Sequence, residues 1–125
     1  MAHALIVDDD CDGREPIAHV LRKAGHQVTC VSDANEAIAL LTDNPPDVVI
    51  LDLMMPEMDG FEFLEELRKE EANRSIPTIV ITSKTLTVED RLRLNGSAEK
   101  ILLKKDSSRE DLLRQVRDLA STYAR

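Results

Sequence analysis

Apolar residues along the chain alternate between short continuous runs and helical stripes. A continuous apolar run is typical of a strand buried between helix layers, whereas spacing at i, i+3, i+4 and i+7 indicates one face of a helix. The runs predict strands at 5–7, 28–31, 48–51, 78–81 and 101–103. The stripes between them predict helices at 17–24, 34–41 and 61–67, a fourth from 87 to about 95, and a last one from 108 to 123. Strand–helix alternation of this kind predicts an α/β fold, a doubly wound parallel sheet with helices on both faces.

Glycine, proline and capping residues mark where the predicted helices begin and end. Gly25 stops the first helix and residues 44–46 close the second. Residues 87–90 are typical of a capping box that opens the fourth helix, and residues 107–110 cap the last. The run at 28–31 predicts alternating exposure. The last helix is expected to bury the face formed by Leu112, Leu113, Val116, Leu119 and Tyr123.

The chain has 125 residues and a mass of 14.0 kDa, the size of one ordinary domain. We expect a single domain over 1–125, with no output domain after the last helix. No apolar run in the sequence approaches the roughly 20 residues of a membrane-spanning helix, and residues 1–7 lack the basic start of a signal peptide. We therefore expect a cytoplasmic protein without membrane contact.

Cys11 and Cys30 are too few for a disulfide framework, so we expect reduced thiols.

Acidic side chains are concentrated in the first part of the chain. The net charge is −8, and residues 1–90 carry 7 basic and 19 acidic side chains, whereas residues 91–125 carry 9 and 5. An acidic chain with two Phe, one Tyr and no Trp is poorly suited to phosphate backbones or base stacking, so direct nucleic-acid binding is not expected. The asymmetry predicts an anionic pocket at one end of the molecule and a basic face elsewhere; solvated helix faces are the simpler alternative.

Polar residues follow four of the predicted strands, at the edge where the carboxyl ends of parallel strands meet. Crowded carboxylates repel one another unless a cation intervenes, and carboxylate oxygens suit a hard divalent ion such as Mg²⁺. A hydroxyl and an ammonium at the same edge supply the hydrogen bond and the positive charge that a transferred phosphoryl group requires. In chain order, these residues are Asp8, Asp9 and Asp10, then Asp52, then Thr82 and Ser83, then Lys104 and Lys105.

The same residues match the pattern of a known family in identity, order and spacing. Asp8 and Asp9, the stretch 52–60 (DLMMPEMDG), Thr82 and Lys104 are arranged as in the receiver domains of two-component response regulators. The sequence resembles this family over about residues 4–122. The resemblance implies a flavodoxin-like, five-stranded sheet with strand order 2-1-3-4-5, and a phosphoprotein of a phosphorelay signal transduction system.

The resemblance also implies a phosphoacceptor and a metal site. Asp52 would take a phosphoryl group from a phosphohistidine to form an aspartyl phosphate. Asp9, Asp52 and the backbone carbonyl of Met54 would ligate Mg²⁺ or Mn²⁺ directly, and Asp8 would hold a metal-bound water. An Asp at the end of a strand is often a helix N-cap, and this is the alternative role for Asp10 or Asp12.

Two further matched residues would contact the phosphoryl group. Thr82 would hydrogen-bond one of its oxygens and draw in the loop after the fourth strand, and Lys104 would pair with its charge. Ser83 competes with Thr82 for the hydroxyl role and Lys105 competes with Lys104, and position directly after the apolar run favours Thr82 and Lys104.

The implied donor is a sensor histidine kinase or a histidine phosphotransfer protein, and the implied output is contact with a downstream protein target. The chain would then catalyse only its own phosphoryl transfer and slow dephosphorylation, and would not be an enzyme acting on a separate substrate. The alternative is a phosphoryl shuttle or phosphate sink. Ile101, where the family commonly has an aromatic switch residue, favours the shuttle. The basic residues Arg91, Arg93, Lys100, Arg114 and Arg117 favour an interaction face.

Lys105 stands where the family usually has proline, often after a cis peptide bond, and we expect a trans bond because a non-proline cis bond costs about 3–4 kcal/mol.

Two rival sites fit poorly. A calcium loop starting at Asp8 needs a glutamate at its twelfth position, which is His19. A haloacid-type phosphatase needs an acid two residues after Asp52, where Met54 stands.

Overall fold

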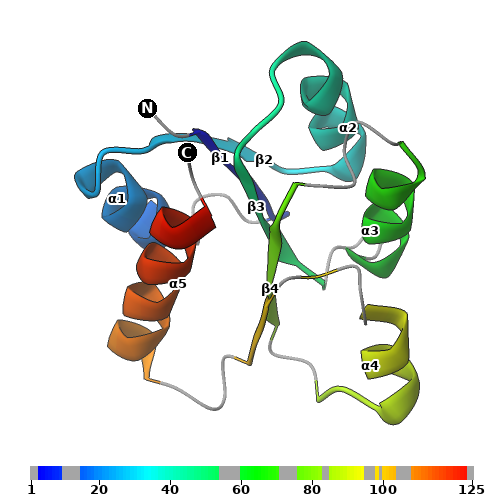
Figure 1. Cartoon of the computed structure of the whole chain (residues 1–125). Coiled ribbons are helices and arrows are strands. Elements are labelled where there is room, and N and C mark those ends of the chain that lie inside the picture. Colours follow the sequence, from blue (N-terminus) through cyan, green and yellow to red (C-terminus); the bar gives the residue numbers. More distant parts are fainter. Residues whose placement is uncertain are drawn as a thin grey trace.

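The computed structural model places a parallel sheet between two layers of helices (Figure 1). The strand order is β2-β1-β3-β4-β5, which confirms the order expected for a flavodoxin-like sheet. The strands are β1 (His3–Val7), β2 (Gln27–Val31), β3 (Val48–Asp52), β4 (Thr78–Thr82) and β5 (Lys100–Leu103). The helices are α1 (Glu15–Lys23), α2 (Ala34–Asp43), α3 (Gly60–Lys69), α4 (Val88–Leu94) and α5 (Arg109–Tyr123). The structure describes residues 3–9, 15–53, 60–70, 76–82, 85–94, 98, 100–103 and 108–123.

The central strands are buried on both faces because helices cover both sides of the sheet. All residues of β1, β3 and β4 are buried. Figure 1 shows α1 and α5 on one side of the sheet and α2, α3 and α4 on the other. The sheet therefore divides the apolar interior into two clusters, one under each helix layer.

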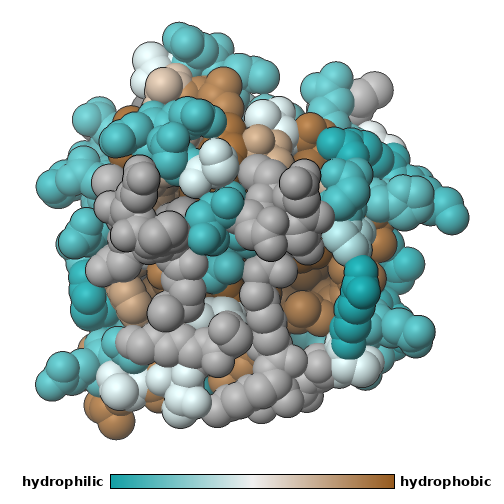
Figure 2. All heavy atoms as spheres, turned by 180° about the vertical axis from the view of Figure 1, so that it is seen from behind, coloured by the Kyte–Doolittle hydropathy of each residue, from teal (hydrophilic) through white to brown (hydrophobic). Residues whose placement is uncertain are grey.

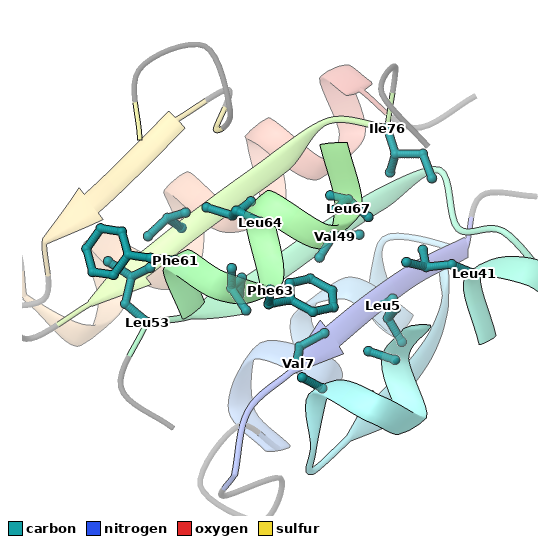
Figure 3. Packing of buried hydrophobic residues seen from close by; sticks show 14 of the residues in the cluster. Leu5, Val7, Leu41, Val49, Leu53, Phe61, Phe63, Leu64, Leu67 and Ile76 are labelled. Atoms are coloured by element: carbon teal, nitrogen blue, oxygen red, sulfur yellow. The ribbon is translucent and has the colours of Figure 1, made fainter. Parts of the chain in front are cut away.

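The larger cluster lies under α2, α3 and α4, and Figure 3 shows the side chains of α3 directed into it. Phe63 is fully buried, as are Leu64 and Leu67. The helical spacing of Phe61, Leu64 and Leu67 indicates one apolar stripe, and α3 buries a broader face than this stripe because Phe63 is buried as well. The other cluster lies under α1 and α5 and includes Ala120, a residue that the predicted face of the last helix also omitted.

The predicted stop and capping residues of the helices are confirmed where the described residues reach them, although α1 begins two residues before its predicted start. Gly25 has φ +95°, a conformation that favours glycine, and its N–H donates to the carbonyl of Arg22 at 3.0 Å. Thr87 and Asp90 exchange two hydrogen bonds of 3.0 Å, which makes the capping box reciprocal. At α5 the capping hydroxyl belongs to Ser108, which accepts from the Asp111 N–H at 3.2 Å. The predicted end of the fourth helix near 95–96 lies outside the described residues.

Two expectations about β2 are wrong. Its exposure does not alternate: Gln27 is exposed, the next three residues are half-buried, and Val31 is buried, because an edge strand is partly covered on both faces. Cys30 is also disulfide-bonded rather than reduced. Two cysteines are too few for a disulfide framework, but they suffice for one disulfide bond. The Asp8 N–H donates to the Val31 carbonyl at 3.1 Å, so the chain leaving β1 runs beside this end of β2. Cys11, the other cysteine of the sequence, lies outside the described residues.

The surface coloured in Figure 2, seen from behind, is mostly hydrophilic, with hydrophobic atoms visible between the polar side chains. Among the described residues, no helix combines the length and the apolar character needed to cross a bilayer.

Candidate functional site

The predicted acidic residues meet at the carboxyl edge of the sheet. Asp52 is the last residue of β3, and Asp8 and Asp9 directly follow β1, the neighbouring strand, in which Val7 pairs with Leu51. Asp8, Asp9 and Asp52 each offer one carboxylate oxygen, and these three oxygens lie within 4.8 Å of one another. Parallel pairing thus brings together residues that are 43 positions apart in the chain, as the sequence pattern predicted.

The three carboxylates differ in their exposure to solvent. Asp8 is 2% exposed and Asp52 is 8% exposed, whereas Asp9 is exposed. Burial of an ionised carboxylate is costly unless hydrogen bonds or positive charge compensate it. The edge of the sheet therefore holds two buried carboxylates, Asp8 and Asp52, and one solvent-facing carboxylate in a small volume, and both buried carboxylates take part in other interactions.

The donor set fits a divalent ion. Ligand oxygens about 2.1 Å from Mg²⁺ lie about 3 Å apart when adjacent and about 4.2 Å apart when opposed, so oxygens within 4.8 Å of one another need little movement to share one ion. Hard oxygen donors with one exposed member also leave room for the waters that Mg²⁺ retains. Met54, whose backbone carbonyl was predicted as a further ligand, lies outside the described residues.

Thr82 lies at the same edge of the sheet. It is the last residue of β4 and fully buried, and it follows Ile81, the register partner of Asp52 on the adjacent strand. Thr82 in turn pairs with Leu103, the last residue of β5. Lys104 follows Leu103 in the sequence, but Lys104, Lys105 and Ser83 lie outside the described residues, as does the peptide bond expected to be trans.

Gly60 has a packing role that the sequence analysis did not assign. Its N–H donates to the Leu53 carbonyl at 3.0 Å, which brings the start of α3 against the residue after Asp52. A Cβ at this position would lie 2.6 Å from Leu53 Cα, closer than real Cβ contacts, and 3.1 Å from the Asp52 carbonyl oxygen, tighter than most of them. Glycine is required here by this close approach, and the signal available in the sequence was its place at the end of the 52–60 stretch.

Arg93 of α4 forms a second contact that the sequence analysis did not identify. Its guanidinium donates to Glu65 Oε1 at 2.8 Å and lies 4.5 Å from the centroid of the Phe61 ring. Both partners belong to α3, and Phe61 directly follows Gly60. These contacts tie α4 to the end of α3 that adjoins the acidic site.

The fold that carries this site is similar to known structures. A solved N-terminal receiver domain from Methanoculleus marisnigri JR1 matches with 30% identity and a TM-score of 0.76, covering 100% of this chain and 98% of that one. The chemotaxis protein CheY4 of Vibrio cholerae matches with 32% identity and a TM-score of 0.80, covering 94% and 98%. A receiver domain of the Francisella response regulator 1452 matches with 29% identity and a TM-score of 0.78, covering 98% of each chain.

The family profile described as response regulator receiver domain matches residues 4–117, nearly the whole chain. The match includes Asp8, Asp9, Asp52, Thr82 and Lys104. Together with the sheet order and the acidic edge, it shows that the chain belongs to the receiver domain family of two-component response regulators.

Proposed function

We propose that this receiver domain accepts a phosphoryl group on Asp52 and signals through protein contacts that depend on phosphorylation. The observation that carries the proposal is the cluster of Asp8, Asp9 and Asp52 oxygens within 4.8 Å at the carboxyl edge of the sheet. In open α/β sheets this edge is where ligands bind. A carboxylate held beside two others reacts with a phosphoryl anion only if the negative charge is offset.

In the proposed reaction a carboxylate oxygen of Asp52 attacks the phosphorus of a phosphohistidine. The new P–O bond forms as the P–N bond breaks, and the released imidazole nitrogen takes up a proton from solvent. Thr82 donates its hydroxyl to a phosphoryl oxygen, and Lys104 offsets the charge on another. The fixed positions of Asp52 and Thr82 at the ends of paired strands orient the acceptor before the donor arrives.

Mg²⁺ or Mn²⁺, held by Asp9, Asp52 and the Met54 carbonyl with Asp8 acting through a water, would neutralise the charge that otherwise keeps a phosphoryl anion from a carboxylate. The fit of the donor set supports this assignment. Asp9 is exposed and Asp8 is buried, which suits direct ligation from the solvent side by Asp9 and water-mediated contact by Asp8.

The proposed donor is a sensor histidine kinase or a histidine phosphotransfer protein, and the proposed output is a downstream protein. The domain would catalyse its own phosphorylation and slow dephosphorylation, and would not act as an enzyme on a separate substrate. We place it in the cytoplasm, where ATP charges such kinases. The Cys30 disulfide is atypical of that compartment, so its oxidation state in cells tests the location.

Ile101 favours a second candidate function, that of a phosphoryl shuttle or sink. This side chain is half-buried and packs against the larger apolar cluster. An aliphatic residue in that position does not offer the aromatic rotamer change through which many receivers report phosphorylation. A domain lacking that response would pass its phosphoryl group onward to a second histidine.

Intact-mass spectrometry after incubation with acetyl phosphate tests the proposal. We expect one phosphoryl adduct that requires Mg²⁺ and is lost in Asp52→Asn. Asp47→Asn is the matched control, because Asp47 lies at the opposite edge of the sheet and the amide oxygen of asparagine can still accept from the His3 N–H. An adduct that persists in Asp52→Asn refutes the phosphoacceptor assignment.

Transfer experiments separate the two functions. Under the first, phosphorylation shifts backbone amide resonances of α4 and β5, and the phosphoryl group is not passed on when a histidine phosphotransfer protein is added. Under the second, the label moves to the phosphotransfer protein and the resonances of α4 stay in place.

A further inference from the structure

A groove between α1 and α5 lies far from the acidic site. The two helices lie side by side on one face of the sheet (Figure 1), and the groove of about 370 Å³ between them is lined by Val20, Lys23, Ala24 and Arg117. Because α1 runs back toward the start of β2, its last turn lies near the amino edge of the sheet, opposite Asp52. This end of the helix pair is fixed by a 3.2 Å hydrogen bond between His26 Nε2 and Ser121 Oγ.

The floor of this α1–α5 groove is apolar. Val20 is half-buried and Ala24 is exposed, whereas Leu21 of the same helix and Val116 of α5 are fully buried in the apolar cluster. A side chain seated on Val20 and Ala24 would therefore rest on two helices that are each anchored in that cluster. Small apolar side chains on the floor leave room for an aliphatic side chain of a partner.

Two cations flank the floor, one from each helix. Lys23 is exposed and, within the part of the chain that the structure describes, forms no hydrogen bond or ion pair. Arg117 pairs with its neighbour Asp118 at 3.1 Å, but both side chains are about half exposed, and such a pair contributes little. Both cations are thus available to an incoming carboxylate.

The charge of the helix pair favours an acidic partner. The chain has a net charge of −8, whereas α1 and α5 together carry five basic and four acidic side chains. With Lys23 and Arg117 at its flanks, the groove therefore repels an acidic segment less than the chain as a whole does. The groove is also open, with three of its four lining residues exposed, which suits a side chain of a protein better than a small molecule that needs enclosure.

We propose that the α1–α5 groove binds an acidic amphipathic segment of a partner protein. An aliphatic side chain of the segment packs on Val20 and Ala24, and carboxylates flanking it pair with Lys23 and Arg117. The site lies at the opposite end of the molecule from Asp52, so it is a second contact surface and does not depend on the phosphorylation chemistry proposed above.

Fluorescence polarisation with a labelled 15-residue amphipathic peptide, leucine on one face and glutamate on both flanks, tests this inference. We expect the wild-type chain to bind it and the double variant Lys23→Glu/Arg117→Glu to bind at least about tenfold more weakly. The matched control is Lys69→Glu/Arg109→Glu, which makes the same change in net charge at exposed residues of α3 and of the first turn of α5 and should bind like wild type. A peptide with glutamine in place of glutamate should bind weakly to all three proteins.

Equal loss in both double variants, or no binding to the wild type at 1 mM peptide, overturns the proposal. The proposal is also overturned if the wild type forms a dimer and Lys23→Glu/Arg117→Glu abolishes that dimer, because the occupant of the groove would then be a second copy of the chain. Chemical-shift mapping on the wild type keeps the test independent of variant folding, since the shifted amides should cluster around Val20, Ala24 and Arg117. Asp52→Asn should bind the peptide like wild type. Failure of the phosphorylation proposal can therefore be told apart from failure of the groove proposal.

Discussion

Replacing Asp52 by asparagine should stabilise the metal-free protein. The substitution removes one of three carboxylates whose oxygens lie within 4.8 Å of one another. Two unit charges at that separation repel by about 3.5 kcal/mol at an effective dielectric constant of about 20, and by about 0.9 kcal/mol in water. The pair of buried carboxylates, Asp52 and Asp8, is nearer the first value, and the pair with exposed Asp9 is nearer the second.

The net gain is smaller than the sum of these repulsions because Asp8 and Asp52 already take part in other interactions, which offset part of them. We expect Asp52→Asn to raise the free energy of unfolding by about 1–3 kcal/mol without Mg²⁺. For a domain of this length the unfolding entropy of about 2.1 cal/mol/K per residue makes 1 kcal/mol equal to about 4 °C in Tm. The expected increase in Tm is therefore roughly 4–12 °C.

Differential scanning calorimetry in EDTA, repeated in excess Mg²⁺, measures the effect. Mg²⁺ present at about 100 times its Kd would stabilise wild type by about 2.7 kcal/mol and the variant, which lacks one ligand, by less. The advantage of the variant should thus shrink or reverse when the ion is added. It should also shrink in high salt, because screening weakens the repulsion.

Two related variants serve as controls. Asp9→Asn removes an exposed carboxylate from the same cluster and should stabilise less than Asp52→Asn, whereas Asp47→Asn at the opposite edge should change stability by less than about 0.5 kcal/mol. A lower Tm for Asp52→Asn than for wild type in EDTA would show that repulsion does not dominate this edge of the sheet.

Three further predictions concern packing around the site and the cysteines. Gly60→Ala should lower the unfolding free energy by about 1–3 kcal/mol in urea titrations, because its Cβ would lie 2.6 Å from Leu53 Cα; unchanged stability would show that the α3 start moves aside freely. In the same titrations Arg93→Ala should lower the unfolding free energy by about 1 kcal/mol, and Arg93→Lys should lower it less because lysine retains the charge opposite Glu65. Equal losses of unfolding free energy in the two variants would mean that the charge of Arg93 does not stabilise this contact. Iodoacetamide should label no cysteine of the unfolded, unreduced chain and two after reduction, and labelling before reduction would contradict the Cys30 disulfide.

The order of elements and the composition of the acidic site were predictable because both depend on local signals. Buried parallel strands are continuous apolar runs, and the residues directly after such runs lie at one edge of the sheet whatever the details of packing. Asp8 and Asp52 could therefore be placed together before their distance was known. Thr82 could be placed at the same edge for the same reason.

Contacts between elements could not be predicted because no local pattern encodes them. Phe63 lies between two stripe positions of α3 and is buried because that helix packs deeply against β1 and β3, as Figure 3 shows. The need for glycine at position 60 arises from the approach of Leu53, and the number of cysteines in the sequence does not show that Cys30 is disulfide-bonded. Arg93 looks like an exposed helix residue in the sequence, and its partners on α3 are set by the spacing of two separate helices.

The packing around α4 bears on how phosphorylation would be reported. Asp52 adjoins Leu53, the Leu53 carbonyl accepts from Gly60, and the next residue, Phe61, lies under the Arg93 guanidinium of α4. A rearrangement at the end of β3 therefore meets α4 through contacts with α3, on a path that does not include position 101. Ile101 packs against the same apolar cluster as Phe61 and Leu94, so it can support α4 without changing rotamer. If the chain signals as proposed, Ile101 does not offer the aromatic route and these contacts would supply another, which is why we propose contact-dependent signalling ahead of the shuttle.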